Sequence, residues 1–202
     1  MSSRDDILSA IRSHPLEATP LPTLQQDWIE FEDPVAHFGE TLASVGGRCI
    51  PVVTLDDINR ELSNLTEFST AIVRVSTVDG VGSPTQDLDE IADPHELESV
   101  DFAVLRGEFA VAENGAVWVT DAALKHRVPY FLSQHLALIV PANEVLQNMH
   151  AAYERLSFME RSFGAFISGP SKTADIEQSL VIGAHGPRSH VVFLVQDGQG
   201  QS

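Results

Sequence analysis

FAVLRGEFAVAENGAVWV, residues 102–119, is the stretch that indicates the fold most directly. It holds three short apolar runs, and the turn Glu113-Asn114-Gly115 separates the last two. Short apolar runs between turn residues favour buried strands, and Asn-Gly favours a hairpin because both residues tolerate positive φ. We therefore predict three strands here, of which the last two form an antiparallel hairpin.

Apolar strands and amphipathic helices alternate on either side of this stretch. The helices that we predict cover residues 33–46, 54–65 and 143–156. The other predicted strands cover residues 49–53, 71–75, 136–140, 165–167 and 191–195. Residues 76–99 are acidic and rich in turn residues, so we expect a surface excursion there. The alternation is typical of an α/β fold with a mostly parallel sheet, helices on both faces, and an antiparallel insertion around Glu113.

The first residues have a different character. A short helix is predicted from Ser3, and His14-Pro15 ends it. A proline-containing linker follows, in which the apolar rings of Trp28 and Phe31 need a surface to cover them. We therefore divide the chain into a preface, residues 1–32, and an α/β domain, residues 33–202. The preface docks either on its own domain or on a partner.

Composition excludes several classes of function. Twelve Lys and Arg residues stand against 29 Asp and Glu residues, and the net charge of -17 argues against binding to nucleic acid. Cys49 is the only cysteine, whereas an iron-sulfur cluster needs about four thiolates. No apolar run reaches the ~18 residues of a membrane span, and the polar first residues do not resemble a signal peptide. We expect a cytoplasmic protein without a membrane span.

The densest polar segment is SGPSKTADIE, residues 168–177, which leaves one predicted strand and is expected to enter a helix. The residues that we single out are Gly169, Ser171, Lys172, Thr173, Asp175 and Glu177. Glycine allows close backbone approach, and the hydroxyls, the ammonium group and free helix-end amides would hold a carboxylate or phosphate. The two acids would move a proton or orient Lys172. Alternatively, Ser171 or Asp175 only caps the helix, and Glu177 faces water.

Two familiar catalytic motifs do not fit this segment. A phosphate-binding P-loop would need glycine at positions 166 and 171, where Phe166 and Ser171 stand. A nucleophile elbow around Ser171 would need glycine at position 173, where Thr173 stands.

Two further residues are candidates for chemistry. Glu113 would act as a base or nucleophile if its surroundings raised its pKa, or else it is merely a polar hairpin corner. His185 lies in a Gly-Pro turn and could bind a ligand or relay a proton. The histidines show no metal-binding spacing, so we expect no metal site. Ligands in parallel sheets lie beyond the carboxyl ends of strands, which draws attention to the loops after residues 112, 140 and 167.

Three segments resemble a known family. ISGPSKTADIEQSLVIGAHGPRSHVVFL, residues 167–194, resembles the carboxy-terminal signature of the lactate utilization protein C family, also called the YkgG or LUD-domain family. AVAENGAVWV, residues 110–119, and HLALIVP, residues 135–141, resemble two more of its motifs. The positions characteristic of that family are Glu113, Gly115, Gly169, Pro170, Ser171, Thr173, Ala174, Asp175, Glu177, Gly183, His185, Gly186 and Pro187. Where family members more often carry a hydroxyl residue, this chain has Asn114.

The resemblance implies a Rossmann-like fold similar to the sugar-phosphate isomerase and CoA-transferase superfamily. It also implies a role in oxidising L-lactate to pyruvate beside partner proteins, at least one of which carries iron-sulfur clusters. The present chain would then bind a small carboxylate or phosphate and hold no cofactor itself.

Two other hypotheses remain. The first is a stand-alone enzyme that acts on a sugar phosphate or CoA thioester through Glu113. The second is an interaction module whose preface, with Trp28 and Phe31, docks a partner.

Overall fold

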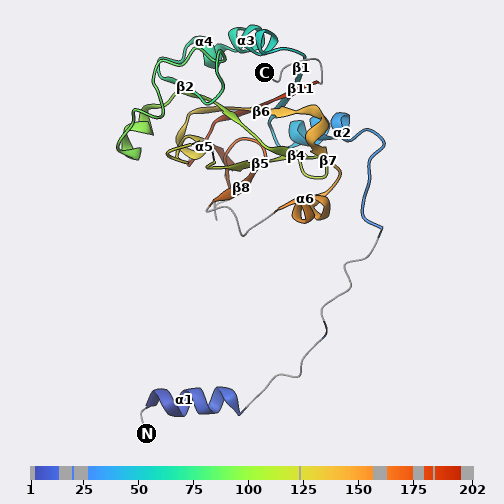
Figure 1. Ribbon diagram of the computed structural model, residues 1–202, viewed down its shortest axis with the longest axis vertical. Helices are drawn as coiled ribbons and strands as arrows, with labels where there is room; N and C mark the ends of the chain where they lie inside the picture. Colours follow the sequence, from blue (N-terminus) through green and yellow to red (C-terminus); the bar gives the residue numbers. More distant parts are fainter. Residues whose placement is uncertain are drawn as a thin grey trace.

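The computed structural model describes residues 3–13, 20, 27–122, 124–156, 163–174, 180–183 and 185–196. Helix α1 (Ser3–Arg12) forms where the sequence predicts it and buries none of its residues. It lies apart from all the other elements, which pack together (Figure 1).

Five parallel strands form the central sheet, in the order β1-β11-β6-β3-β2. Their bounds are β1 Arg48–Val52, β2 Arg74–Ser76, β3 Phe102–Arg106, β6 His135–Pro141 and β11 Ser189–Val195. The apolar runs of β3, β6 and β11 are buried on both faces, which is why these strands read as continuous rather than alternating hydrophobic stretches. The predicted parallel sheet is thereby confirmed.

A second, mixed sheet has the order β7-β4-β5-β8. Its strands are β4 Phe109–Val111, β5 Ala116–Thr120, β7 Val145–Leu146 and β8 Gly164–Ile167. Strands β4 and β5 are antiparallel, so the predicted hairpin is confirmed. The expected insertion is therefore a complete sheet rather than an isolated hairpin.

The layers follow from which faces are apolar. Helices α3 (Leu55–Ser63) and α4 (Thr66–Ser69) cover one face of the central sheet (Figure 1). The opposite face packs against the second sheet and helix α2 (Pro34–Ser44). Helix α6 (Met149–Arg155) covers the outer face of the second sheet.

This arrangement differs from the expected single sheet with helices on both faces. In β4 and β5, Ala110 and Val117 join the core beneath the central sheet, whereas Phe109 and Trp118 pack toward α6. Because both faces of the hairpin are apolar, it is buried between two layers.

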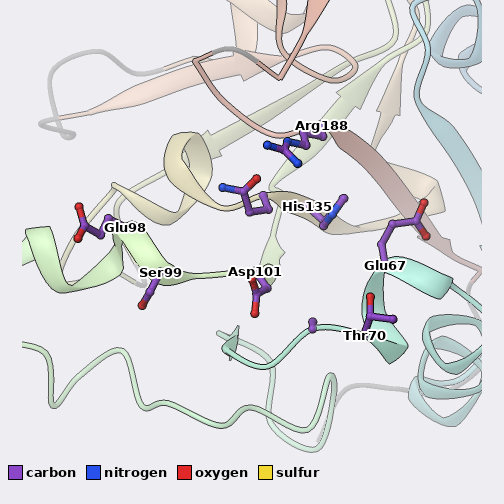
Figure 2. A pocket seen from close by; sticks show the side chains of 9 residues that line it. Glu67, Thr70, Glu98, Ser99, Asp101, His135 and Arg188 are labelled. Atoms are coloured by element: carbon purple, nitrogen blue, oxygen red, sulfur yellow. The ribbon is translucent and has the colours of Figure 1, made fainter.

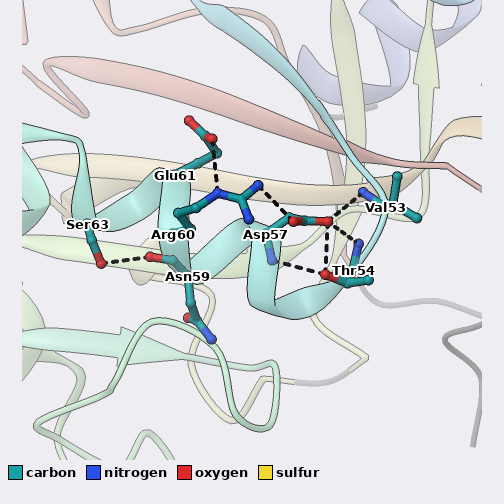
Figure 3. Close-up of polar contacts among 7 residues, drawn as sticks. All are labelled: Val53, Thr54, Asp57, Asn59, Arg60, Glu61 and Ser63. Carbon is teal, nitrogen blue, oxygen red and sulfur yellow. Dashed lines mark hydrogen bonds and ion pairs between the residues drawn. The ribbon is translucent and has the colours of Figure 1, made fainter.

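Helix α3 begins at a capping box (Figure 3). The Asp57 carboxylate accepts the Thr54 N–H at 2.9 Å, and the Thr54 hydroxyl accepts the Asp57 N–H at 3.1 Å. Hydrogen bonds from the Thr54 side chain and backbone lower the pKa of Asp57. Reciprocal bonds of this kind satisfy two backbone donors of the first turn, which fixes the turn between β1 and α3.

Two predicted elements are wrong in detail. Residues 142–148 are not helical throughout: the 3-10 helix η2 (Ala142–Glu144) leads into β7, which pairs with β4. Helix α6 starts only after Asn148, whose side chain accepts the Ala151 N–H at 3.0 Å. A helix was expected within residues 168–177, but the described part of this segment, up to Ala174, contains the strand β9 (Lys172–Ala174) instead. This strand pairs with β10 (Leu180–Ile182).

The expected surface excursion over residues 76–99 is more deeply packed than predicted. It contains the 3-10 helix η1 (Pro94–Ser99), and Asp93 caps it. Its buried apolar residues are Val78, Val81, Leu88, Ile91 and Leu97. They are spaced too irregularly to show a strand or helix period, which hid their burial from pattern analysis.

Residues 27–31, which we call the strap, pack on their own domain. The Trp28 ring stacks on His150 with 3.3 Å between ring centroids, and Phe31 stacks on His37 at 3.7 Å. The Asn148 side chain also donates to the Ile29 carbonyl at 2.8 Å. Of the two docking modes that the sequence left open, the strap adopts the intramolecular one.

Candidate functional site

The family-like hairpin turn and the segment after β8 are neighbours in space. The Ser168 hydroxyl donates to the Asn114 carbonyl at 2.8 Å. Gly115 and Gly169 both have positive φ, and a Cβ on either would lie within 2.8 Å of the α2 backbone or the Val45 carbonyl that follows it. Glycine is therefore required where both turns approach the end of α2.

The segment from Ser168 also joins the turn before β11. The Ser171 N–H donates to the Pro187 carbonyl at 2.8 Å, and the Gly183 N–H donates to the Ser171 carbonyl at 2.9 Å. A Cβ at Gly186 would lie 3.0 Å from the Ser171 Cβ. These contacts hold the two polar turns of the sequence prediction side by side.

A cavity of about 320 Å³ lies between these turns, and we call it the loop cavity. Its lining residues are Tyr130, Phe131, Phe166, Ile167, Ser168, Gly169, Pro170, Ser171, Lys172, His185, Gly186 and Pro187. Its volume falls at the lower end of the range of about 300–1,000 Å³ usual for small-molecule pockets. Apolar walls, the Ser171 hydroxyl and the Lys172 ammonium group suit a small anion with an apolar part, whereas the Ser168 hydroxyl already donates to Asn114.

The loop cavity brings together Gly169, Ser171, Lys172 and His185, four of the residues singled out in the sequence. Thr173 continues from it into β9. Asp175 and Glu177 fall outside the described residues. Because Lys172 begins a strand, the expected helix-end amides are absent from the described part of this segment, residues 168–174, and any anion would rely on side chains and turn amides.

Glu113 lies outside the loop cavity's lining. Its side chain is exposed, and its Oε2 accepts the N–H of Met149 at 2.8 Å, in the first turn of α6. A carboxylate is favoured there because the free N–H groups of a helix start carry partial positive charge. Glu113 thus links the hairpin corner to α6, while Asn114, next to it, contacts the loop cavity's segment through Ser168.

Tyr130 is a lining residue that sequence reasoning missed. It lies in α5 (Pro129–Leu132), and its hydroxyl donates to the carbonyls of Arg106 and Thr120, each at 3.2 Å. Burial raises the pKa of Tyr130, so it stays a neutral donor. The signal available in the sequence was an aromatic residue just before a buried strand, which is too common to stand out.

The loop cavity lies at the edge of the central sheet opposite to the one expected. Its α5 wall precedes β6, and its 185–187 wall precedes β11, so both belong to the amino ends of parallel strands. The loop after Ile167 reaches this edge because β8 belongs to the second sheet and runs antiparallel to β5. The expectation was therefore right for the loop after Ile167 and wrong only for the end of the central sheet, because a strand's sheet and direction are not readable from its own residues.

Two observations bear on metal and redox chemistry elsewhere in the described residues. Within the described residues, no group of three or more His, Cys, Asp or Glu side chains is arranged to hold a metal ion. Burial raises the pKa of the Cys49 thiol to about 11, which disfavours the thiolate that binds metals. No helix in the described ranges is long and apolar enough to cross a membrane.

The described residues form an α/β protein with a cavity of about 320 Å³ beside a parallel sheet. The chain belongs to the LUD domain family, which matches residues 90–195, more than half of its length. It is similar to lactate utilization protein C of Bacillus pumilus, with 32% identity over 106 residues, 50% of this chain and 44% of that protein. It is also 30% identical over 108 residues to the uncharacterized protein YkgG of Escherichia coli, 50% of this chain and 47% of YkgG. The chain thus spans about half the length of these relatives.

Two further proteins are similar to this chain over more of its length. Lactate utilization protein C of Anoxybacillus flavithermus is 27% identical over 159 residues, 78% of this chain and 68% of that protein. A DUF162 family protein from Deinococcus radiodurans has a similar fold, with a TM-score of 0.56 and 16% identity, over 80% of this chain and 96% of that one. The structural likeness supports the fold alone.

Proposed function

We propose that this protein binds a small carboxylate in the loop cavity and serves as the subunit without clusters in an assembly that oxidises L-lactate to pyruvate. The observation that carries the proposal is the convergence of the 168–172 and 185–187 segments on one cavity with Lys172 as its cation. Membership of the LUD domain family and the similarity to lactate utilization protein C support the choice of lactate.

The chemistry assigns a limited role to this chain. Oxidation of lactate releases two electrons and two protons, and the single, partly buried thiol of Cys49 offers no site for them. Partner subunits with iron-sulfur clusters would accept the electrons. Lys172 and the Ser171 hydroxyl would hold the carboxylate, with Thr173 and His185 as further donors, and Asp175 or Glu177 would orient Lys172.

Several broader assignments belong to the same proposal. We place the protein in the cytoplasm, without nucleic-acid binding, as a preface of residues 1–32 followed by a LUD-type domain of residues 33–202. We also relate its fold to the sugar-phosphate isomerase and CoA-transferase superfamily. The mixed second sheet beside a parallel sheet is compatible with that relation.

The test is anaerobic, lactate-dependent dye reduction in extracts that lack this chain or contain it as wild type or a variant. Lys172→Gln should lose most of the activity because the amide cannot neutralise a carboxylate. The matched control is Lys125→Gln, which removes a lysine whose ammonium group donates to the Asp89 carbonyl outside the loop cavity. Asp175→Asn should also weaken activity. Activity that does not depend on the chain, or equal activity of both lysine variants, would refute the proposal.

The stand-alone enzyme remains the alternative. It needs Glu113 as base or nucleophile, and the contact of Glu113 with the start of α6 gives that carboxylate a structural task already. Covalent labelling of Glu113 by a thioester or sugar-phosphate substrate would favour this alternative over the subunit.

A further inference from the structure

A second cavity, of about 480 Å³, opens at the same edge of the central sheet, and we call it the edge cavity (Figure 2). Its lining residues are Glu67, Thr70, Ala71, Glu98, Ser99, Asp101, Gln134, His135 and Arg188. They come from α4 and the two residues after it, from η1 and from the positions that begin or precede β3, β6 and β11. None of them belongs to the loop cavity.

Arg188 supplies the permanent positive charge. Its aliphatic stem packs under Gly183, which has a φ of 76° and where any Cβ would clash with the Arg188 side chain. Its backbone N–H donates to the Gln134 carbonyl at 2.8 Å. Among the described residues no carboxylate lies within ion-pair distance of the guanidinium. The group is thus positioned by its stem and left available to a ligand.

His135 adds a neutral donor or acceptor. Its Nδ1 lies 2.8 Å from the Ser189 hydroxyl, which orients the ring. Burial lowers the pKa of His135, and Arg188 lowers it further against the opposing effect of Glu67 and Asp101. The imidazole is therefore uncharged at neutral pH, and its Nε2 has no hydrogen-bond partner in the part of the chain that the structure describes.

Three carboxylates complete the edge cavity, and they are not equivalent. Asp101 is anchored, because its Oδ2 accepts the N–H groups of Ile72 and Val73 at 2.8 and 2.9 Å. Glu67 and Glu98 are exposed and form no ion pair with any described residue. Figure 2 shows Glu67 and Glu98 at opposite ends of the group of lining residues, with His135 between them.

We infer that the edge cavity binds a small zwitterion with one carboxylate and one ammonium group, such as an α-amino acid. Arg188 can hold the carboxylate through two parallel hydrogen bonds, and Glu67 or Glu98 can hold the ammonium group. A phosphate dianion is disfavoured by the two unpaired carboxylates, and a simple cation is disfavoured by the guanidinium. Gln134 and the hydroxyls of Thr70 and Ser99 can form neutral polar contacts with the rest of the ligand.

This site is separate from the proposed lactate site but adjacent to it. A third cavity, of about 340 Å³, lies between them; it shares Glu98 and Gln134 with the edge cavity and Phe131, His185 and Gly186 with the loop cavity. The two cavities use different charged groups. A substitution that abolishes binding in one cavity therefore need not affect binding in the other.

The test is titration calorimetry of the full chain with L-alanine, L-glutamine and L-arginine. Propionate and n-propylamine are the probes with one charge each, and inorganic phosphate is the anion control. We expect at least one amino acid to bind at least tenfold more tightly than the other three probes. Arg188→Gln should weaken that binding at least tenfold, whereas Arg4→Gln, which changes an arginine in α1, should leave it unchanged.

Glu98→Gln on the exposed side of η1 provides a second variant in case Arg188→Gln fails to fold. Either it or Glu67→Gln should weaken amino-acid binding, and Lys172→Gln should not. The inference is overturned if no amino acid binds at millimolar concentration, if phosphate or propionate binds as tightly, or if neither the arginine variant nor the glutamate variants alter the affinity.

Discussion

The side chain of Gln147 forms two hydrogen bonds with the backbone of Phe31, although the residues are 116 positions apart. The Phe31 N–H donates to Oε1 at 2.7 Å, and Nε2 donates to the Phe31 carbonyl at 3.2 Å. The Gln147 carbonyl in turn accepts the N–H of Glu113 at 3.1 Å. One residue therefore connects the strap to the corner of the β4-β5 hairpin.

Gln147→Leu should release the strap. It removes both bonds to Phe31 and should lower the free energy of unfolding by about 1–3 kcal/mol, since the backbone groups of Phe31 lose their partners. Hydrogen exchange of the Phe31 amide should speed up in the same variant. Gln196→Leu, which changes an exposed glutamine, is the control. Unchanged protection of Phe31 would contradict this description of the strap.

His190 should make stability depend on pH. Burial lowers its pKa to about 4, and neither ring nitrogen has a partner among the described residues. The unfolded chain takes up this proton with a pKa of about 6.5, so the native state loses stability as the pH falls from 6.5 toward 4. When the pH falls from 7 to 5, the free energy of unfolding should decrease by roughly 2 kcal/mol less in His190→Leu than in the wild type. Denaturant unfolding at the two pH values measures this difference.

An exposed histidine provides the contrast for His190. The hydrogen bond that the protonated His95 ring donates to the Asp93 carboxylate raises the pKa of His95, so any contribution of His95 to stability is present at low pH and lost as the pH rises. His95→Leu should therefore change the pH dependence only slightly and in the opposite direction. Identical pH profiles for wild type and His190→Leu would show that the buried ring does not titrate as described.

Alanine substitutions at Gly80 and Gly169 should distinguish the cost of backbone strain from the cost of a steric clash. Gly169 and Gly80 have the same φ of 72°, but a Cβ at Gly169 would lie 2.7 Å from the Val45 carbonyl, whereas Gly80 has open space around it. Gly80→Ala should cost about 1–2 kcal/mol from backbone conformation alone. Gly169→Ala should cost clearly more in thermal or denaturant unfolding. Equal losses would mean that the loop cavity's wall can move away from α2.

Glu113 should prove structural in the isolated chain. Glu113→Gln keeps an oxygen that can accept the Met149 N–H, whereas Glu113→Ala removes it. We expect the alanine variant to lose about 1 kcal/mol of stability and the glutamine variant to lose less. In the lactate-dependent dye assay, Glu113→Gln should retain most activity. Loss of turnover with unchanged stability would instead support a catalytic carboxylate.

The strands could be predicted from the sequence because their signal is local. The runs at 102–105, 109–112 and 116–119 and the Asn114-Gly115 turn each carry their own pattern, and all became strands or a hairpin. β7 was missed because Val145 and Leu146 also fit a helical stripe, and only pairing with β4 decides between the two. The second sheet could not be predicted either, because the pattern of a strand does not indicate which sheet the strand will join.

Of the two cavities, only the loop cavity could be predicted from local sequence. Gly169, Ser171 and Lys172 lie close together in the chain, so their common cavity was predictable, and His185 followed from its turn. The edge cavity collects Glu67, Glu98, His135 and Arg188 from four separate segments. No motif joins them, and only the parallel register of β3, β6 and β11 brings their leading residues to one edge.

The place of β11 in the central sheet has a consequence for biosynthesis. β11 lies between β1 and β6, yet it is made after every other described strand. While the chain emerges from the ribosome, β1 has no neighbour, and β6 presents an open edge until Ser189–Val195 are available. Exposed strand edges invite pairing with other chains, so these two edges must wait unprotected or shielded by chaperones. The central sheet can therefore be completed only after β11 has been made, when this strand pairs with both β1 and β6.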